Sequence, residues 1–208
     1  MRKESACKKC RRTGEKLFLK GERCFAPKCA MIKKPYPPGS QGKKRRRGVL
    51  SEYGIQLKEK QKLRKIYNIR EAQLRRYFGE AAKVRGVVTD ILLAKLETRM
   101  DNIIFRLGIA ESRAKARQIV GHGHILLNDK KIDIPSINVK KGDVVRIKKS
   151  SLAKPLFKDL EVRLKKYNPP AWLSLDKKDF FAAVLRTPAK EDVGSNIDFQ
   201  MIVEYYSR

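Results

Sequence analysis

The sequence lacks the features that mark membrane and exported proteins. No apolar run approaches the ~20 residues that a helix needs to cross a membrane, and no basic amphipathic helix suited to a membrane surface is evident. The basic start, residues 1–7, leads into no apolar segment of the kind found in signal peptides. We therefore expect a cytoplasmic protein with no membrane partner.

Catalytic groups are also scarce. The 208 residues contain two histidines, His122 and His124, and neither has a serine, cysteine or carboxylate at the spacing of a catalytic motif. The glycine-flanked segment 121–123 lacks the lysine and the following helix of a phosphate-binding loop. The sequence predicts a protein that is not an enzyme, with both histidines at a turn between a helix and a strand.

Acidic residues are few compared with basic ones. The chain has 22 Asp and Glu against 50 Lys and Arg, which gives a net charge of +28 and an isoelectric point near 10.2. Such a field attracts polyanions, and nucleic acid is the first candidate. A hydrophobic content of 41% nevertheless supports a folded protein with a core.

Cysteine is confined to the first 29 residues, where two close pairs occur. The four are Cys7, Cys10, Cys24 and Cys29. In a reducing cytoplasm this pairing favours a metal over disulfides. Four thiolates can surround one Zn²⁺ tetrahedrally, and the bound ion would supply folding free energy to a segment with few apolar residues. An iron–sulfur cluster is an alternative with the same ligands, and four unrelated reduced thiols are the alternative without metal.

Half of the excess charge lies in residues 1–50, which hold 17 basic and three acidic residues, a net charge of +14. The densest run is Lys43, Lys44, Arg45, Arg46 and Arg47. A run of this kind can be a solvated tail or a localisation signal. Because a second basic module follows, we favour contact with RNA phosphates.

The middle of the chain is predicted to be helical and then to change to strands. Residues 51–95 show apolar stripes at helical spacing, and so do residues 97–107, where Gly108 ends the pattern. Ser112 is a predicted N-cap for a helix over residues 113–120, with small apolar side chains on one side and cations on the other. Short strands are predicted at residues 125–127, 132–134 and 144–147.

The last quarter is harder to interpret. A helix is predicted from about Lys154 to residue 166, and residues 172–176 favour a strand or a loop. Residues 179–186 are compatible with a strand or a short helix. The tail at residues 199–206 has a high strand propensity and is predicted to close a sheet.

Several of these motifs resemble a known family. The string Leu96–Asp101, the segment Ser112–Arg117, Gly123-His124-Ile125 and Asn128 resemble the small RNA-binding domain named after the fourth protein of the small ribosomal subunit. The cysteine spacing, the basic run, residues 53–62 and the ending at residues 203–208 resemble the zinc-binding, four-cysteine form of bacterial small ribosomal subunit protein four.

The resemblance implies an α+β fold in three parts. Residues 1–42 would form a zinc-stapled basic extension with its linker. Residues 43–96 would form a mostly helical domain, joined by residues 175–208. Residues 97–174 would form a small RNA-binding domain of two helices and antiparallel strands, with its motif core at residues 97–149.

The resemblance also implies a function. A structural component of the small subunit would bind 16S rRNA directly, nucleate assembly of the subunit body, and contribute to translational accuracy with small-subunit protein five. Small-subunit protein three and messenger RNA where it enters the subunit are further implied partners. Besides residues 43–47, the residues implied to contact RNA are Arg99, Arg106, Ser112, Arg113, Arg117, Gln118, His122 and Asn128.

Two other classes of protein carry similar features. Pseudouridine synthases and a tyrosyl-transfer-RNA synthetase contain the same small domain, but residues 152–208 hold no acid–base pair suited to catalysis. A free RNA chaperone with a zinc knuckle would differ by being found off the ribosome.

Overall fold

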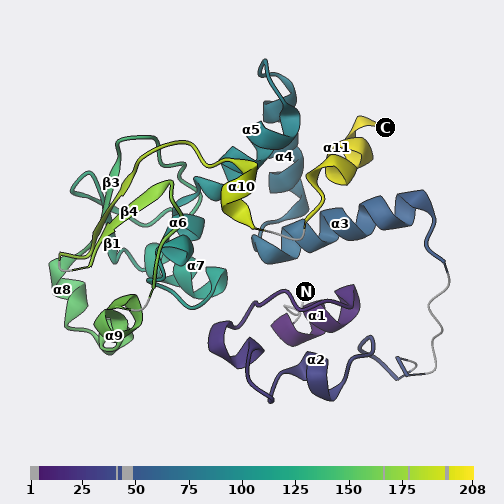
Figure 1. The fold of residues 1–208 in the computed structure, drawn as a ribbon, viewed down its shortest axis with the longest axis horizontal. Helices are drawn as coiled ribbons and strands as arrows, with labels where there is room; N and C mark the ends of the chain where they lie inside the picture. Colours follow the sequence, from purple (N-terminus) through teal and green to yellow (C-terminus); the bar gives the residue numbers. More distant parts are fainter. Residues whose placement is uncertain (1–4, 41, 44–48, 166, 178, 195–196) are drawn as a thin grey trace. The chain divides into compact units, whose positions relative to one another are not determined.

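The computed structural model describes residues 5–40, 42–43, 49–165, 167–177, 179–194 and 197–208. It divides into two compact units, one of residues 1–89 and 196–208 and the other of residues 90–195. Helices and one antiparallel sheet build the structure, so the predicted α+β fold is confirmed (Figure 1). Within the described ranges, no helix is both long and apolar enough to cross a membrane.

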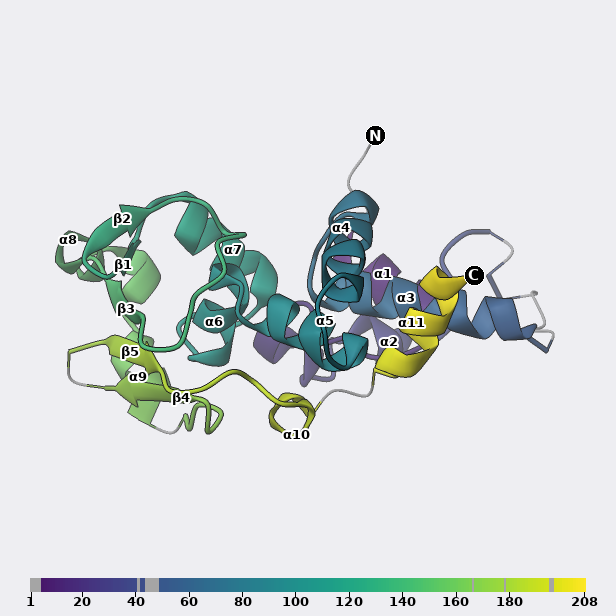
Figure 2. The same cartoon turned by 90° about the horizontal axis from the view of Figure 1, so that it is seen from above.

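The first unit is helical. Its elements are α1 (Ala6–Thr13), the 3-10 helix η1 (Gly21–Cys24), α2 (Ala30–Lys33), α3 (Glu52–Ile66), α4 (Glu71–Ala82) and α11 (Phe199–Ser207). The C-terminal α11 packs against α3 and α4, as Figures 1 and 2 both show. The end of the chain therefore completes the core of the unit in which the chain begins.

The C-terminal segment is a helix, and the predicted strand there is wrong. Asp198 caps the helix, because its carboxylate accepts hydrogen bonds from two backbone N–H groups of the first turn at 2.9 and 3.3 Å. Phe199 and Ile202 are buried three residues apart, and the Tyr206 ring stacks on Phe78 with centroids 4.9 Å apart. This helical spacing of packed side chains outweighs the strand propensity of the segment.

The second unit combines helices with a sheet. Its elements are α5 (Val88–Glu97, which begins two residues before the unit), α6 (Met100–Arg106), α7 (Arg113–Gly121), β1 (Ile125–Leu127), β2 (Lys130–Ile132), β3 (Val144–Ile147), α8 (Lys149–Leu152), η2 (Pro155–Phe157), α9 (Leu160–Lys165), β4 (Leu173–Asp176), β5 (Phe181–Val184) and α10 (Lys190–Val193). The sheet order is β2-β1-β3-β5-β4, and every pair is antiparallel.

One hydrophobic core joins the helices to one face of this sheet. It contains apolar side chains of α6, α7, all five strands and the segment after α8, with Trp172 fully buried. Ala116, Ile119 and Val120 of α7 are buried as their spacing predicts. Since side chains along a strand point alternately to the two faces of the sheet, the side chains of the other face do not belong to this core.

The boundaries within the second unit differ from the predicted ones. The chain returns to the first unit only from residue 196, and not from 175, because β4 and β5 form main-chain hydrogen bonds in the sheet with β3. The helix predicted over residues 97–107 is shorter, since Arg99 is extended and α6 begins after it. The helix predicted from Lys154 is divided into η2 and α9, and Pro155 begins the first of these.

Candidate nucleic-acid interface

The end of α6 is fixed by a glycine and a tyrosine. Gly108 has φ +73°, a conformation that side chains rarely adopt, and the ring of Tyr167 lies 2.8 Å from where a Cβ at residue 108 would be. The Tyr167 hydroxyl donates to the carbonyl of Arg106 at 2.9 Å. The chain can therefore turn sharply from α6 into the loop that leads to α7.

The helix α7 has one buried side and one basic side. Ser112 caps it, because its Oγ accepts a hydrogen bond from the backbone N–H of Lys115 at 3.3 Å. The buried Ser112 hydroxyl thus has a structural role at a position where RNA contact was predicted. Lys115, Arg117 and Gln118 are exposed, and His122 is exposed just after the helix. Their side chains are available to an external ligand.

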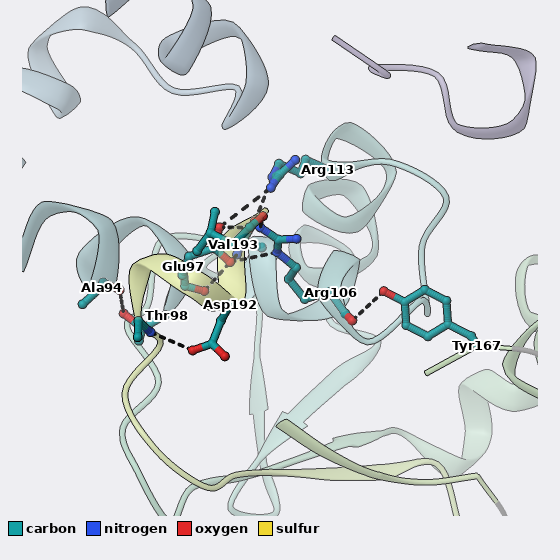
Figure 3. A network of polar contacts seen from close by, with 10 residues as sticks. Ala94, Glu97, Thr98, Arg106, Arg113, Tyr167, Asp192 and Val193 are labelled. Atoms are coloured by element: carbon teal, nitrogen blue, oxygen red, sulfur yellow. Dashed lines mark hydrogen bonds and ion pairs between the residues drawn. The ribbon is translucent and has the colours of Figure 1, made fainter. Parts of the chain in front are cut away.

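A buried carboxylate organises the inner side of the helical pair. Glu97 has 0% exposure and accepts hydrogen bonds from Arg106 (Nε and Nη2, both 2.9 Å) and from Asn102 (Nδ2, 2.8 Å) (Figure 3). Arg113 Nε donates to Asn102 Oδ1 at 2.7 Å, and its guanidinium lies 4.4 Å from the Phe105 ring centroid. Arg106 and Arg113 are therefore partly buried and held within the protein.

Arg99 has a similar internal role. Its exposure is 1%, and its Nε and Nη2 donate to the two carboxylate oxygens of Asp101 at 3.0 and 2.7 Å. The same carboxylate lies 3.8 Å from Nη1 of the exposed Arg117. The Arg99 side chain is thus directed into the protein instead of onto an RNA-contacting surface, because its charge is matched inside by Asp101.

The turn between β1 and β2 uses Asn128 for its own structure. Asn128 and Asp129 have φ of +48° and +63°, as a two-residue hairpin turn requires. Asn128 Oδ1 accepts from the backbone N–H of Val144 at 2.9 Å, and its Nδ2 donates to Asp143 at 2.8 Å. Although Asn128 is exposed, its amide already ties the hairpin to the start of β3.

The hairpin adds cations that the sequence reasoning did not select. Lys130 and Lys131 are exposed on β2. The aliphatic stem of Lys131 lies where a Cβ of Gly123 would be, which brings it beside the residue after His122. Asn128-Asp129, between two short apolar segments, is a turn signal in the sequence, and a two-residue turn there would have placed this lysine opposite β1. An exposed basic surface thus extends from α7 to β2.

The basic run before α3 lies mostly outside the described residues. Lys44, Arg45, Arg46 and Arg47 are not described. Lys43 is exposed, with its Nζ 5.5 Å from the centroid of the Tyr36 ring. Arg11 lies 4.9 Å from the same centroid and donates from Nε to the Tyr36 carbonyl at 2.9 Å.

The four cysteines lie in the first unit. Cys7 and Cys10 are in α1, Cys24 ends η1, and Cys29 precedes α2. Burial raises the pKa of Cys10, a hydrogen bond from the backbone of Leu17 lowers it, and the other three cysteines raise it. Among the described residues, no group of three or more His, Cys, Asp or Glu side chains is arranged to hold a metal ion. A metal-binding geometry is therefore not shown.

The chemistry of the sulfur atoms nevertheless fits a metal. The backbone N–H of Lys20 donates to Cys24 Sγ at 3.3 Å, and that of Leu17 donates to Cys10. Zinc is bound by thiolates, and a cation close to Cys10 would offset the burial and the neighbouring cysteines that raise its pKa.

The two histidines do not form a catalytic group. His124 is 6% exposed and Ser151 is 2% exposed, and Nδ1 of the first lies 3.0 Å from Oγ of the second. Burial lowers the pKa of His124, and the nearby Lys154, His122 and Lys148 lower it further. A substrate could not reach this buried pair, which instead fixes α8 beside the start of β1.

Comparison with known proteins gives matches over nearly the whole chain. Residues 1–97 match the family model of the ribosomal protein S4/S9 N-terminal domain, and residues 98–145 match that of the S4 domain. The small ribosomal subunit protein uS4 of Heliobacterium modesticaldum is 50% identical over 202 residues, which cover 97% of this chain and 96% of that protein. The protein of the same name from Syntrophomonas wolfei is 46% identical over 205 residues, 99% of this chain and 98% of that protein. That of Thermus thermophilus is 46% identical over 202 residues, 97% and 96% of the two chains.

Proposed function

Because the chain belongs to the uS4 family of small ribosomal subunit proteins, we propose that it binds 16S rRNA directly within the small subunit. The family consists of structural ribosomal proteins, which are not enzymes. The observation that carries the proposal is the exposed basic surface of α7 and β2, formed by Lys115, Arg117, Lys130 and Lys131.

The arrangement of this surface favours recognition of RNA shape. Lysine and arginine side chains contact phosphates whatever the base sequence of the RNA, whereas Gln118 and His122 can also reach sugar or base atoms. Arg106 and Arg113 support the surface from inside, because their ion pairing with Glu97 fixes α6 against α7. Binding should therefore depend on a folded RNA more than on a short sequence.

Binding to a 16S rRNA transcript at several salt concentrations tests this function. Each phosphate contact releases counterions, so a protein with 6–10 contacts loses roughly 10³–10⁵ in affinity between 50 and 200 mM salt. We expect a steep loss of this kind. Sedimentation of a cell extract gives a second test, since absence of the protein from the small-subunit fraction would contradict the proposal.

The finer roles are also part of the proposal. We expect the protein to nucleate assembly of the subunit body and, with small-subunit protein five, to contribute to translational accuracy. Small-subunit protein three and messenger RNA where it enters the subunit are further proposed partners. Reconstitution of subunits without this protein should leave the body incomplete, and a misreading reporter should respond to changes at its contact with protein five.

A structural metal completes the proposal for the first unit. Cys7, Cys10, Cys24 and Cys29 would hold one Zn²⁺, with an iron–sulfur cluster as the alternative, and the ion would stabilise residues 5–40. Metal analysis should find one zinc per chain, whereas absorbance near 400 nm would indicate iron–sulfur. Chelation or Cys24→Ser should increase proteolysis of this segment alone, and unchanged proteolysis would contradict a structural ion.

A further inference from the structure

A groove lies on the sheet face opposite the core. It is lined by Leu126 of β1, Arg146 of β3, Lys148 and Lys149 at the start of α8, and Phe180 and Phe181 at the start of β5. All of these residues belong to the second unit. The groove therefore lies on the face of the sheet opposite α7, which packs on the core face. Of the exposed basic surface, only Lys131, the partner of Leu126, points to the groove's face.

The strand register explains how the groove is built. Leu126 is paired with both Lys131 and Arg146, and Arg146 is paired with Phe181. Residues paired across antiparallel strands point to the same face, so these side chains form one row over four strands. Their neighbours Ile125, Val145 and Ala182 point the other way, into the core. The row thus offers an apolar and aromatic floor with a guanidinium in its middle.

Cations surround this floor. The Arg146 guanidinium lies 5.6 Å from the centroid of the Phe181 ring, and Lys148 and Lys149 are exposed. Two carboxylates also line the groove, and one of them, Asp129, is ion-paired with Arg146 at 3.3 Å. Two exposed lysines therefore remain beside the aromatic floor, on a chain with a net charge of +28.

We propose that this groove is a second RNA site, which binds an unpaired nucleotide. Its base would stack on Phe181 beside Arg146, and its phosphate would lie between Lys148 and Lys149. Unpaired bases bind proteins by stacking on aromatic rings and arginine planes, with nearby cations on the backbone. The inference rests on the proposed function, and it adds a contact on the face of the sheet that α7 does not cover.

The tryptophan content of the protein allows a direct test. Trp172, the sole tryptophan, is 0% exposed, so its fluorescence should respond little to RNA. Phe181→Trp places an indole in the groove, and a stacked base quenches indole fluorescence. With the full-length chain we expect quenching by a single-stranded uridine oligomer and by a 16S rRNA transcript, but not by a duplex of equal charge. Equal quenching by duplex and single strand, or none by either, would overturn the proposal.

Affinity measurements provide a second test. Phe181→Leu should weaken binding to the 16S rRNA transcript by about 5- to 150-fold, the range for loss of one stacked base. Leu185→Ala removes an equally apolar but unrelated exposed side chain of the same unit and should have no effect. Circular dichroism would check that each variant is folded. Wild-type affinity of a folded Phe181→Leu variant would overturn the groove assignment while leaving the proposed function intact.

The lysines can be tested with a matched pair of double variants. Lys148→Gln with Lys149→Gln should reduce the dependence of affinity on salt, whereas Lys154→Gln with Lys158→Gln, also exposed cations nearby, should change it less. If the wild-type chain does not bind 16S rRNA at all, the result contradicts the proposed function, on which the groove assignment rests. If an acidic peptide quenches the indole at residue 181 and RNA does not, the groove binds a protein segment and the nucleotide assignment is overturned.

Discussion

Arg106 meets Glu97 through two hydrogen bonds, from Nε to Oε2 and from Nη2 to Oε1, each 2.9 Å long. The glutamate has 0% exposure, and the same arginine also donates to the carbonyl of Val193 at 3.2 Å. Two residues nine positions apart thus join the end of α5 to the end of α6 and to α10. A planar guanidinium suits this two-point contact better than a lysine would.

Glu97→Gln should destabilise the second unit. The substitution removes the negative charge but leaves Arg106 and Arg113 partly buried beside it, and an uncompensated buried charge is costly. We expect a loss of about 2–4 kcal/mol in unfolding free energy, reduced by the partial exposure of the arginines. Urea unfolding followed by Trp172 fluorescence measures it. Glu161→Gln, which alters an exposed carboxylate, is the control, and equal stability of the two variants would refute the role of the ion pair.

The double variant Lys115→Gln and Arg117→Gln should weaken RNA binding without unfolding the protein. Both side chains are exposed, and the ion pair of Arg117 with Asp101 is long, at 3.8 Å. Loss of two phosphate contacts should reduce the slope of log affinity against log salt by roughly 1.5. Filter binding to a 16S rRNA transcript measures the slope, with Lys165→Gln as the control. An unchanged slope would remove α7 from the interface.

The sequence predicted the local structure of the interface better than the roles of its residues. The N-cap at Ser112 and the end of a helix at Gly108 follow from local rules, and the structure has both. Arg99 and Asn128 were selected in the same way as Arg117. In the folded chain, Arg99 is hydrogen-bonded to Asp101 and Asn128 to the start of β3. These partners become apparent only when the chain is folded.

Long-range pairing also explains what the sequence left open. Residues 179–186 were compatible with a strand or a helix, and the strand β5 forms because β3, more than 30 residues earlier, offers an open edge. In the tail, strand propensity pointed to a sheet, but Phe199 and Ile202 are buried in a helix that packs on α3 and α4, more than 100 residues earlier. Neither partner lies within a local sequence window, so propensity alone could not decide.

Gly108→Ala should destabilise the turn between α6 and α7. A Cβ there would lie 2.8 Å from the Tyr167 ring, and φ of +73° is strained for alanine. We expect a loss of about 1–3 kcal/mol, measured by urea unfolding with Trp172 fluorescence. Gly121→Ala is a matched control, because a Cβ at residue 121 would meet nothing within 4 Å. If both variants were as stable as the wild type, Tyr167 would not constrain the turn.

In the first unit, the carboxylate of Glu71 connects three helices. Lys60 Nζ and the Tyr206 hydroxyl each lie 2.8 Å from Oε1, and Arg64 Nη1 lies 3.1 Å from Oε2. Burial raises the pKa of Glu71, but the hydrogen bonds from Lys60 and Tyr206 and the charges of Lys60 and Arg64 lower it below its ordinary value of 4.5. The folded state therefore binds a proton at the Glu71 carboxylate less readily than the unfolded state does.

This difference makes the first unit sensitive to acid. Because the folded-state pKa of Glu71 is lowered, its contribution to stability is fully present above about pH 4.5 and is lost as the pH falls through the lowered value. Thermal unfolding followed by tyrosine circular dichroism between pH 3 and 6 should show this loss. Glu71→Gln should lower stability at pH 6 and flatten the pH dependence, since an amide cannot take up the proton. Glu52→Gln, which alters an exposed carboxylate of α3, should leave the pH dependence in place. Equal slopes for the wild type and Glu71→Gln would show that other carboxylates govern the acid response.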